Sequence, residues 1–383
     1  MLRFGGYNRF MNILVFSWRD PKHPLAGGAE QVMHEHMKGW VAAGHNVTLF
    51  SSQPGGLRSD EEIDGVKIVR GGFQYLGVQI SGFFYYIKNR SNFNFIVDQF
   101  HGVPFFTPIY SRKPKLAVIQ EIARDVWLKN SLAFPLNLII GTLGFLFEPI
   151  FFLFYRNVPF MTGSDSAKKD LAGYGISRNK IYIVPHGVIL PALKPKTNIN
   201  NKVKGAISFL GILSKDKGIE DAIKCFLLLK DSYNFRFWVI GKGENKDYEK
   251  KIRNFAKPLG NRIKFWGYVN ESKKFRLLSK SCLLINPSIH EGWGLVNIEA
   301  NFVGTPVVAY NSAGLVDSIK NGVSGLICER NPSSMKEAIL SVTRNRGNYE
   351  KLVRGAAIWS KNFDWVRSRQ ISLNLINDVY LWR

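Results

Sequence analysis

Short apolar runs alternate with amphipathic stretches along almost the whole chain. In the first half, apolar runs of strand length cover residues 12–18, 46–52, 93–100, 115–120, 160–164 and 181–188. Stretches with helical spacing follow at 30–43 and 165–171. Strands that alternate with helices are typical of a parallel sheet with helices on both faces. The first half is therefore predicted to form a doubly wound α/β domain.

The same alternation starts again after residue 205. Strands are predicted at 206–213, 235–243, 263–269, 282–288 and 305–311, and helices at 217–230, 248–260, 272–281, 294–304, 315–322 and 335–345. This pattern predicts a second α/β domain of similar design, so the fold class is α/β with two Rossmann-like domains.

The stretch between the two halves fits neither pattern. Residues 188–204 contain Pro191, Pro195 and an asparagine-rich run, which indicate an interdomain linker. We assign residues 1–187 to an N-terminal domain, 205–364 to a C-terminal domain and 365–383 to a final helix. Because Met11 opens the first strand, residues 1–10 are interpreted as a dispensable lead or a miscalled start.

Composition and charge narrow the class of protein. The 383 residues are 45% hydrophobic and 21% charged, which is ordinary globular composition. The formal net charge of +23 favours an anionic partner: nucleic acid, an acidic lipid surface or a phosphorylated substrate. Three widely spaced cysteines predict neither a zinc site nor a disulfide framework. With no convincing signal peptide at the N-terminus, we expect a cytoplasmic protein.

One segment suggests contact with a membrane. Residues 130–147 carry no charge, and Glu148 and Pro149 separate them from a second apolar run. These interruptions argue against a membrane span, which needs about 20 predominantly apolar residues. Two interpretations remain. The segment forms a helix buried between the domains, or it lies in a membrane interface with Lys129 and Arg156 at its flanks.

The residues that follow the predicted strands are candidates for the chemistry. In open parallel sheets, ligands bind beyond the carboxyl ends of the strands, and two such domains that face each other form a cleft. After the strand at 282–288 comes Glu291 in a glycine-rich loop, and then a helix that carries Glu299. Free N–H groups at that helix start favour a phosphate, and carboxylates accept hydrogen bonds from sugar hydroxyls. The alternative is a dipole-capping Glu291 and a solvated Glu299.

Other candidates follow other strands, and each is a weaker signal by itself. Lys215 and Lys217 could neutralise a diphosphate, although Lys215 also fits an ordinary surface lysine. The turn from Gly241 to Gly243 allows close approach to a backbone. A second phosphate cradle is predicted at Gly27 and Gly28, and two histidines at the edge of the cleft complete the set: His101 and His186.

Several of these segments together resemble a known family. Residues 289–310, IHEGWGLVNIEANFVGTPVVAY, are similar to the glutamate–seven residues–glutamate signature of retaining glycosyltransferase family 4, which has the GT-B fold. Looser matches run through the chain from Met11 onward: GGAEQV at 27–32, VPHGV at 184–188, GILSKDKGIEDAI at 211–223, VIGKGE at 239–244 and FWGYV at 265–269.

The resemblance implies transfer of a sugar from a UDP- or GDP-sugar to a glycan or lipid-linked acceptor, with retention and without a metal. Glu291 would contact the donor sugar, Glu299 the ribose and Lys217 the diphosphate. The final helix would cross back to the first domain. The other donor-side positions are Gly27, Gly28, Gly211, Lys215, Gly241, Gly243, Gly292, Trp293, Gly294 and Leu295. His101 and His186 would lie on the acceptor side.

Two positions depart from the family's pattern. Ile212 stands where the family usually has an arginine, and Lys215 could substitute for that cation. Gln120, a third candidate catalytic residue beside Glu291 and Lys217, stands where a histidine is usual; it can hydrogen-bond a sugar but cannot take its proton. These departures favour a second hypothesis, a non-catalytic partner subunit that binds nucleotide sugar or glycan. A dinucleotide-dependent oxidoreductase is disfavoured, because no Gly-x-Gly-x-x-Gly motif opens a helix after the first strand. A nucleic-acid-binding protein is disfavoured, because no recognition motif for nucleic acid is present.

Overall fold

The computed structural model describes residues 10–74, 76–123, 127, 135–188, 202–230, 234–289 and 291–382. The chain divides into two compact units. Unit 1 comprises residues 1–187 and 365–383, and unit 2 comprises residues 188–364. All but Phe10 of the predicted lead, and residues 189–201 of the predicted linker, lie outside the described residues.

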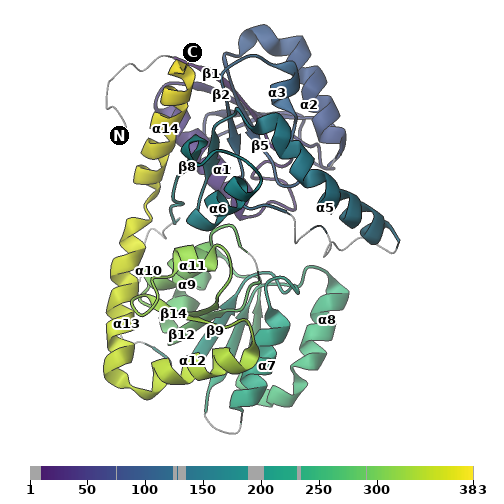
Figure 1. Ribbon diagram of the computed structural model, residues 1–383. Coiled ribbons are helices and arrows are strands. Elements are labelled where there is room, and N and C mark those ends of the chain that lie inside the picture. The colour runs from purple at the N-terminus through teal and green to yellow at the C-terminus, as the bar shows by residue number, and fades with distance from the viewer. Residues whose placement is uncertain are drawn as a thin grey trace. The chain divides into compact units, whose positions relative to one another are not determined.

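Unit 1 is built on an eight-stranded sheet with the order β3-β4-β2-β1-β5-β6-β7-β8 (Figure 1). Neighbouring strands are parallel except for the antiparallel edge pair β3–β4. The strands are β1 (Asn12–Phe16), β2 (Asn46–Ser51), β3 (Asp60–Ile63), β4 (Val66–Arg70), β5 (Phe95–Gln99), β6 (Lys115–Val118), β7 (Phe160–Thr162) and β8 (Ile181–Ile183).

Helices cover both faces of this sheet. They are α1 (Gly28–Ala42), α2 (Leu76–Asn89), α3 (Thr107–Tyr110), α5 (Leu136–Tyr155), α6 (Asp165–Gly173) and α14 (Trp365–Leu381), with 3₁₀ turns η1 (Arg90–Asn92) and η2 (Arg178–Lys180). Side chains alternate between the two faces along a strand, so Ile13 and Val15 face α1 and α14, and Leu14 and Phe16 face α2.

The final helix α14 is part of the core of unit 1. Its Leu375, Ile376 and Val379 are buried in the same cluster as the odd-numbered positions of β1. The Trp40 indole of α1 donates a hydrogen bond to Ser372 Oγ of α14 at 3.1 Å. Helices α1 and α14 therefore form one layer, although more than 300 residues separate them in the sequence.

Unit 2 is built on a six-stranded parallel sheet with the order β11-β10-β9-β12-β13-β14. Its strands are β9 (Ala206–Leu210), β10 (Arg236–Ile240), β11 (Ile263–Gly267), β12 (Leu283–Asn286), β13 (Val307–Tyr310) and β14 (Gly325–Cys328). Its helices are α7 (Ile219–Leu229), α8 (Lys246–Phe255), α9 (Glu271–Lys280), α10 (Leu295–Phe302), α11 (Leu315–Ser318), α12 (Pro332–Arg344) and α13 (Arg346–Trp359), with 3₁₀ turns η4 (Lys257–Arg262) and η5 (Ser360–Asn362).

The predicted fold class of two Rossmann-like α/β domains is confirmed. The structure adds elements that the pattern analysis did not predict: the β3–β4 hairpin, α2, β14 and α13. Cys225 and Cys282 are buried free thiols and Cys328 is a half-buried one. Burial raises the pKa of each thiol to about 12.

Candidate functional site

The strand order of unit 2 marks one edge of its sheet as a ligand site. Strand β9 has β10 on one side and β12 on the other, so the winding of the chain reverses direction between β9 and β12. Ligands of open parallel sheets bind at such a switch point, beyond the carboxyl ends of the strands. The loops that lie there are residues 211–218 after β9 and residues 287–294 after β12.

Two predicted catalytic residues meet at this switch point. The ammonium group of Lys217, in the loop after β9, lies 2.9 Å from the carboxylate of Glu291, in the loop after β12. The side chains are 31% and 20% exposed, so the pair is accessible to a ligand. Sequence reasoning proposed each residue separately, and the structure brings them together.

The two loops are fixed against each other by backbone contacts. The Asp216 carbonyl accepts hydrogen bonds from Ile289 N at 3.0 Å and Ser288 Oγ at 3.2 Å. Gly218 has a φ of 72°, and a Cβ there would lie 2.1 Å from the Pro287 carbonyl oxygen. Only glycine fits this left-handed, closely packed position. The backbone contacts therefore hold the two loops, and with them the Lys217–Glu291 ion pair, in place.

Glu291 lies just before the start of α10, which no side chain of the described residues caps. Gly294, with a φ of 76°, precedes α10, and no acidic residue lies in the first turn of that helix. Behind this turn, the Asn297 amide accepts a hydrogen bond from Asn286 Nδ2 and donates one to Ser318 Oγ, each at 2.9 Å. The first N–H groups of a helix have no acceptor within the helix, and together with the helix dipole they make this turn suitable for an anion.

Trp293 contributes to the site through its backbone. Its side chain is buried and packs edge-to-face against Phe363, with ring centroids 5.3 Å apart. Gly292 and Leu295, on either side of the Trp293–Gly294 pair, are half-buried. The segment therefore presents main-chain groups and the Glu291 carboxylate rather than the indole ring.

The second glutamate of the motif is held by a lysine that the sequence analysis missed. Lys274 of α9 lies 2.7 Å from Glu299 and 2.8 Å from Glu271. Burial raises the pKa of Glu299, and the Lys274 ammonium opposes this shift. Burial also lowers the pKa of Lys274, but the two carboxylates outweigh it, so the net shift is upward. Glu299 is thus oriented by a positive charge on the neighbouring helix.

The glycines predicted after β9 and β10 have packing roles. A Cβ on Gly241, which has a φ of 139°, would lie 1.8 Å from the Gly211 carbonyl oxygen. The Gly243 N–H donates to Glu249 Oε2 at 2.8 Å, so this group is already occupied. Ile212 is 54% exposed, and Lys215 is exposed with no carboxylate partner among the described residues.

A second switch point lies in unit 1, where β1 has β2 on one side and β5 on the other. His101 follows β5 there, and its ring centroid is 6.0 Å from that of Trp18, which follows β1. His101 Nδ1 is 4.0 Å from Glu121 Oε1, and the Arg19 guanidinium stacks over Trp18. Sequence reasoning missed Trp18, although its position directly after the first strand was a usable signal.

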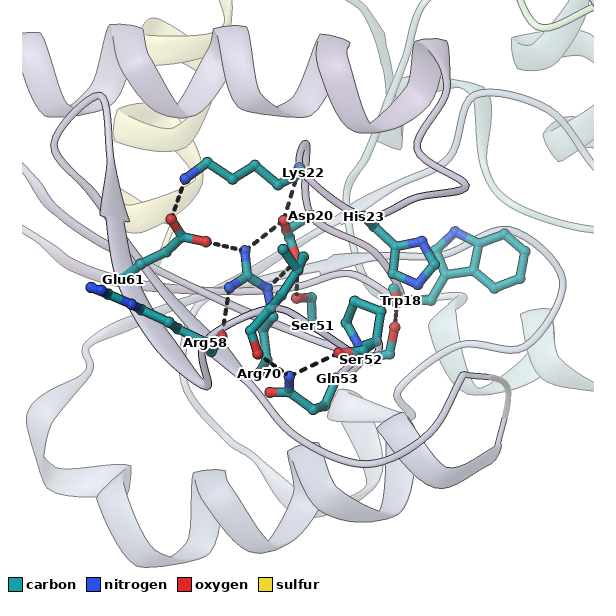
Figure 2. Close-up of polar contacts among 12 residues, drawn as sticks. Trp18, Asp20, Lys22, His23, Ser51, Ser52, Gln53, Arg58, Glu61 and Arg70 are labelled. Carbon is teal, nitrogen blue, oxygen red and sulfur yellow. Dashed lines mark hydrogen bonds and ion pairs between the residues drawn. The ribbon is translucent and has the colours of Figure 1, made fainter.

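A buried ion-pair network anchors the loop that carries Trp18 (Figure 2). Arg70 of β4 donates to both carboxylate oxygens of Asp20, at 2.7 and 2.9 Å, and lies 2.6 Å from Glu61. The side chains of Arg70 and Asp20 are fully buried. Burial opposes ionisation of Asp20, but the Arg70 guanidinium and the hydrogen bonds from Lys22 N and Ser51 Oγ together outweigh burial and lower the pKa of Asp20. The same loop continues to Gly27.

The predicted phosphate cradle at Gly27 and Gly28 is partly occupied. Both glycines are exposed at the start of α1, but the Gly27 N–H donates to Glu30 Oε2 at 2.7 Å. A carboxylate in the first turn disfavours an anion there. Gln120 follows β6 and is half-buried, and its Oε1 accepts no hydrogen bond from the described residues. A sugar hydroxyl could satisfy that oxygen.

His186 is a core residue of unit 1. It is buried, and a Cβ on Gly163 would lie 2.3 Å from its Nε2. Burial lowers the pKa of His186 to about 3. Burial also lowers the pKa of the neighbouring His36 to about 3, with further contributions from His186 and Arg369. Both rings are neutral at physiological pH.

Because His36 and His186 are buried as neutral rings, we expect the free energy of unfolding to fall in acid. Their pKa is about 3 when folded and about 6.5 when unfolded, so the unfolded chain takes up the protons. The stabilisation is complete above about pH 6.5 and is lost as the pH falls towards 3. Each histidine contributes at most about 1.4 kcal/mol per pH unit to this slope. Urea unfolding of unit 1 between neutral pH and about pH 5 should show it.

The matched variant for this measurement is His186→Gln, which has no titrating ring. We expect a shallower dependence of its unfolding free energy on pH than in the wild type. An identical pH dependence in the two proteins would show that His186 is not held neutral.

Among the described residues, no group of three or more histidine, cysteine, aspartate or glutamate side chains is placed to hold a metal ion.

Residues 192–359 match the sequence family described as "Glycosyl transferases group 1". An uncharacterized glycosyltransferase of Methanocaldococcus jannaschii is 27% identical over 217 residues, which are 53% of this chain and 55% of that protein. The chain thus spans about half of the length of this relative. The matched residues make up most of unit 2.

Solved structures extend the similarity to the whole fold. Sucrose-phosphate synthase of Thermosynechococcus elongatus superposes with a TM-score of 0.79 at 16% identity, covering 97% of this chain and 99% of that one. Anabaena HepE, solved in complex with UDP-glucose, superposes with a TM-score of 0.71 at 17% identity, covering 96% and 100%. The predicted GT-B fold is confirmed.

Proposed function

We propose that this protein is a glycosyltransferase that moves a sugar from a nucleotide sugar, a UDP- or GDP-sugar, to a glycan or lipid-linked acceptor. The reaction would retain the anomeric configuration, need no metal and take place in the cytoplasm. The Lys217–Glu291 pair carries the proposal, because it joins a cation and a carboxylate at the switch point of unit 2, which contains the residues that match the group 1 family. HepE, which shares the fold, was crystallised with UDP-glucose.

The proposed roles follow from what each group can bind. The diphosphate of the donor would accept hydrogen bonds from Lys217 and from the N–H groups at the start of α10. Glu291, released from Lys217, would accept hydrogen bonds from the donor sugar. Glu299, oriented by Lys274, would accept them from the ribose.

Sugar transfer breaks the bond between the anomeric carbon and the diphosphate, and negative charge develops on the departing nucleotide. A fixed ammonium group and N–H groups at that position stabilise this charge in the transition state. The acceptor oxygen forms the new bond to the anomeric carbon, and its proton would pass to the departing phosphate oxygen. Gln120 would orient a sugar hydroxyl without taking that proton.

The test uses a panel of nucleotide sugars with the full-length protein. One donor is expected to raise the melting temperature and to be hydrolysed slowly to free nucleotide, because a bound ligand stabilises the folded state. Glu291→Ala should abolish this turnover, whereas Glu337→Ala, a substitution at an exposed position of α12, should retain it. Donor binding without turnover, even with acceptors present, would instead indicate a partner subunit.

A further inference from the structure

Helix α5 has an inverted distribution of polar and apolar side chains. Its one charged residue, Glu148, is buried and accepts a hydrogen bond from Ala123 N at 2.9 Å. Phe152 and Tyr155 on the same face pack into the core of unit 1. The outward face carries Ile139, Leu143, Leu146, Ile150 and Leu153, all exposed. An ordinary surface helix has charged residues on that face.

By length and composition, α5 is also apolar enough to cross a membrane. The segment Leu138–Tyr155 has a mean hydropathy of 1.9, and little of it is buried. However, its inner face is packed on the sheet through Phe152 and Tyr155, and Tyr155 donates a hydrogen bond to buried Asp98 at 2.5 Å. The helix is therefore a fixed part of unit 1. Its exposure favours the membrane-interface interpretation of this segment over a buried helix.

Helix α2 has the same property. Leu76, Ile80, Phe84 and Ile87 recur at helical spacing on its outward side and are between 41% and 64% exposed. Its opposite side, with Val78 and Tyr86, packs into the core. Thus α2 is apolar on both faces, and the outward stripe has no partner in the described structure.

Helices α2, α3 and α5 lie on one side of unit 1 (Figure 1). Leu14 and Ile96 face α2, and Ala117 and Ile119 face α5; by the alternation along the strands, all four lie on one face of the sheet. Ring contacts join the helices in sequence: Phe83 of α2 contacts Tyr110 of α3, and Phe106 beside α3 contacts Phe151 of α5. We call this surface the α2–α3–α5 face.

The exposed charged side chains within and directly after these helices are basic, and exposed Asp60 of β3 lies near Tyr85 of α2. Among described residues 76–123, 127 and 135–156, the exposed charged side chains are Lys88, Arg90, Arg112 and Arg156. Asp98 and Glu148 are buried, and Glu121 is beside His101. Lys88 lies in the last turn of α2, and Arg90, Arg112 and Arg156 follow the carboxyl ends of α2, α3 and α5. These helices all connect parallel strands, so their ends lie along the same edge of the sheet.

We propose that the α2–α3–α5 face docks on an anionic lipid membrane. The apolar side chains would enter the boundary between headgroups and acyl chains, and the basic edge would contact the headgroups. A contiguous apolar surface with a basic edge fits this partner better than a second copy of the chain, whose identical basic edge would repel it. The surface lies in unit 1, and membrane binding does not depend on the proposed donor site.

The experiment is flotation of the full-length protein with phosphatidylcholine vesicles that contain or lack phosphatidylglycerol. We expect binding to the anionic vesicles at low salt, weakened by high salt. Ile80→Asn with Phe84→Asn, and separately Leu146→Asn with Ile150→Asn, should weaken binding about tenfold or more. Lys88→Gln with Arg112→Gln should weaken it about thirtyfold.

The matched control is Leu228→Asn with Ile358→Asn, which removes two exposed apolar side chains of unit 2. It should bind vesicles like the wild type. Circular dichroism would confirm that all variants fold. No flotation, equal flotation with neutral vesicles, or flotation unchanged in the face variants would overturn the proposal. It would equally be overturned by a dimer that the Ile80 and Phe84 changes dissociate without any vesicle binding.

Discussion

Substituting Lys217 by alanine is expected to lower the rate of sugar transfer about a hundred- to a thousandfold, the usual loss on removing one preorganised group that stabilises transition-state charge. In the ligand-free site, the Lys217 ammonium lies 2.9 Å from Glu291. When a donor is bound, the Lys217 ammonium would contact the diphosphate in place of Glu291 and stabilise the negative charge that develops on the diphosphate. The loss should therefore appear mainly in kcat, measured as release of nucleotide with acceptor present.

The missing arginine makes this effect larger here than in a site with two cations. Ile212, which stands where the family that the chain resembles usually has an arginine, is exposed, and Lys217 is the cation that pairs with Glu291 among the described residues. The control is Lys224→Ala, which removes an exposed lysine of α7 that pairs with Asp221. A Lys217→Ala enzyme with the turnover of the Lys224 control would refute a role in catalysis.

Replacing Arg70 by methionine is expected to destabilise unit 1 by about 3–5 kcal/mol, because it leaves the buried Asp20 carboxylate without its partner. Arg70 also donates to the Arg58 carbonyl at 2.7 Å and pairs with Glu61, so one substitution disrupts the whole network. The loop from Trp18 to Gly27 should loosen. Hydrogen exchange of β1, β2 and that loop, together with urea unfolding, measures both effects.

The same network supplies its own control. Lys22 pairs with Glu61 at the exposed end, and its side chain is 51% exposed. Lys22→Met removes an ion pair of the same network but no buried charge, so its cost should stay below about 1 kcal/mol. Equal stability of the Arg70→Met and Lys22→Met proteins would mean that Asp20 tolerates the loss of its partner.

The alternation of apolar runs was sufficient to predict the architecture, because most strands of both parallel sheets are buried on both faces. It failed at α2, since a helix with apolar side chains on its inner and outer faces has no amphipathic period. It also failed at the β3–β4 edge, where DEEI is polar and exposed on an edge strand.

Those residues of the candidate site that lie close together in the sequence could be predicted. Glu291 and Glu299 are close in the sequence, so a local motif revealed them. Lys274 reaches Glu299 from another helix, and Arg70 reaches Asp20 from 50 residues away. Such pairings depend on how elements pack and leave no local pattern. The roles of Gln120, His101 and the glycines at 27 and 28 stay predictions.

The return of α14 to unit 1 has a consequence for how the chain folds during synthesis. Unit 2 is continuous in sequence, whereas the core of unit 1 is completed by Leu375, Ile376 and Val379. When the first 187 residues have left the ribosome, the apolar surface of α1 still lacks its cover. Domains usually fold in the order of their translation. Here the core of unit 1 can be completed only after all of unit 2 has been synthesised, because its last helix is at the end of the chain.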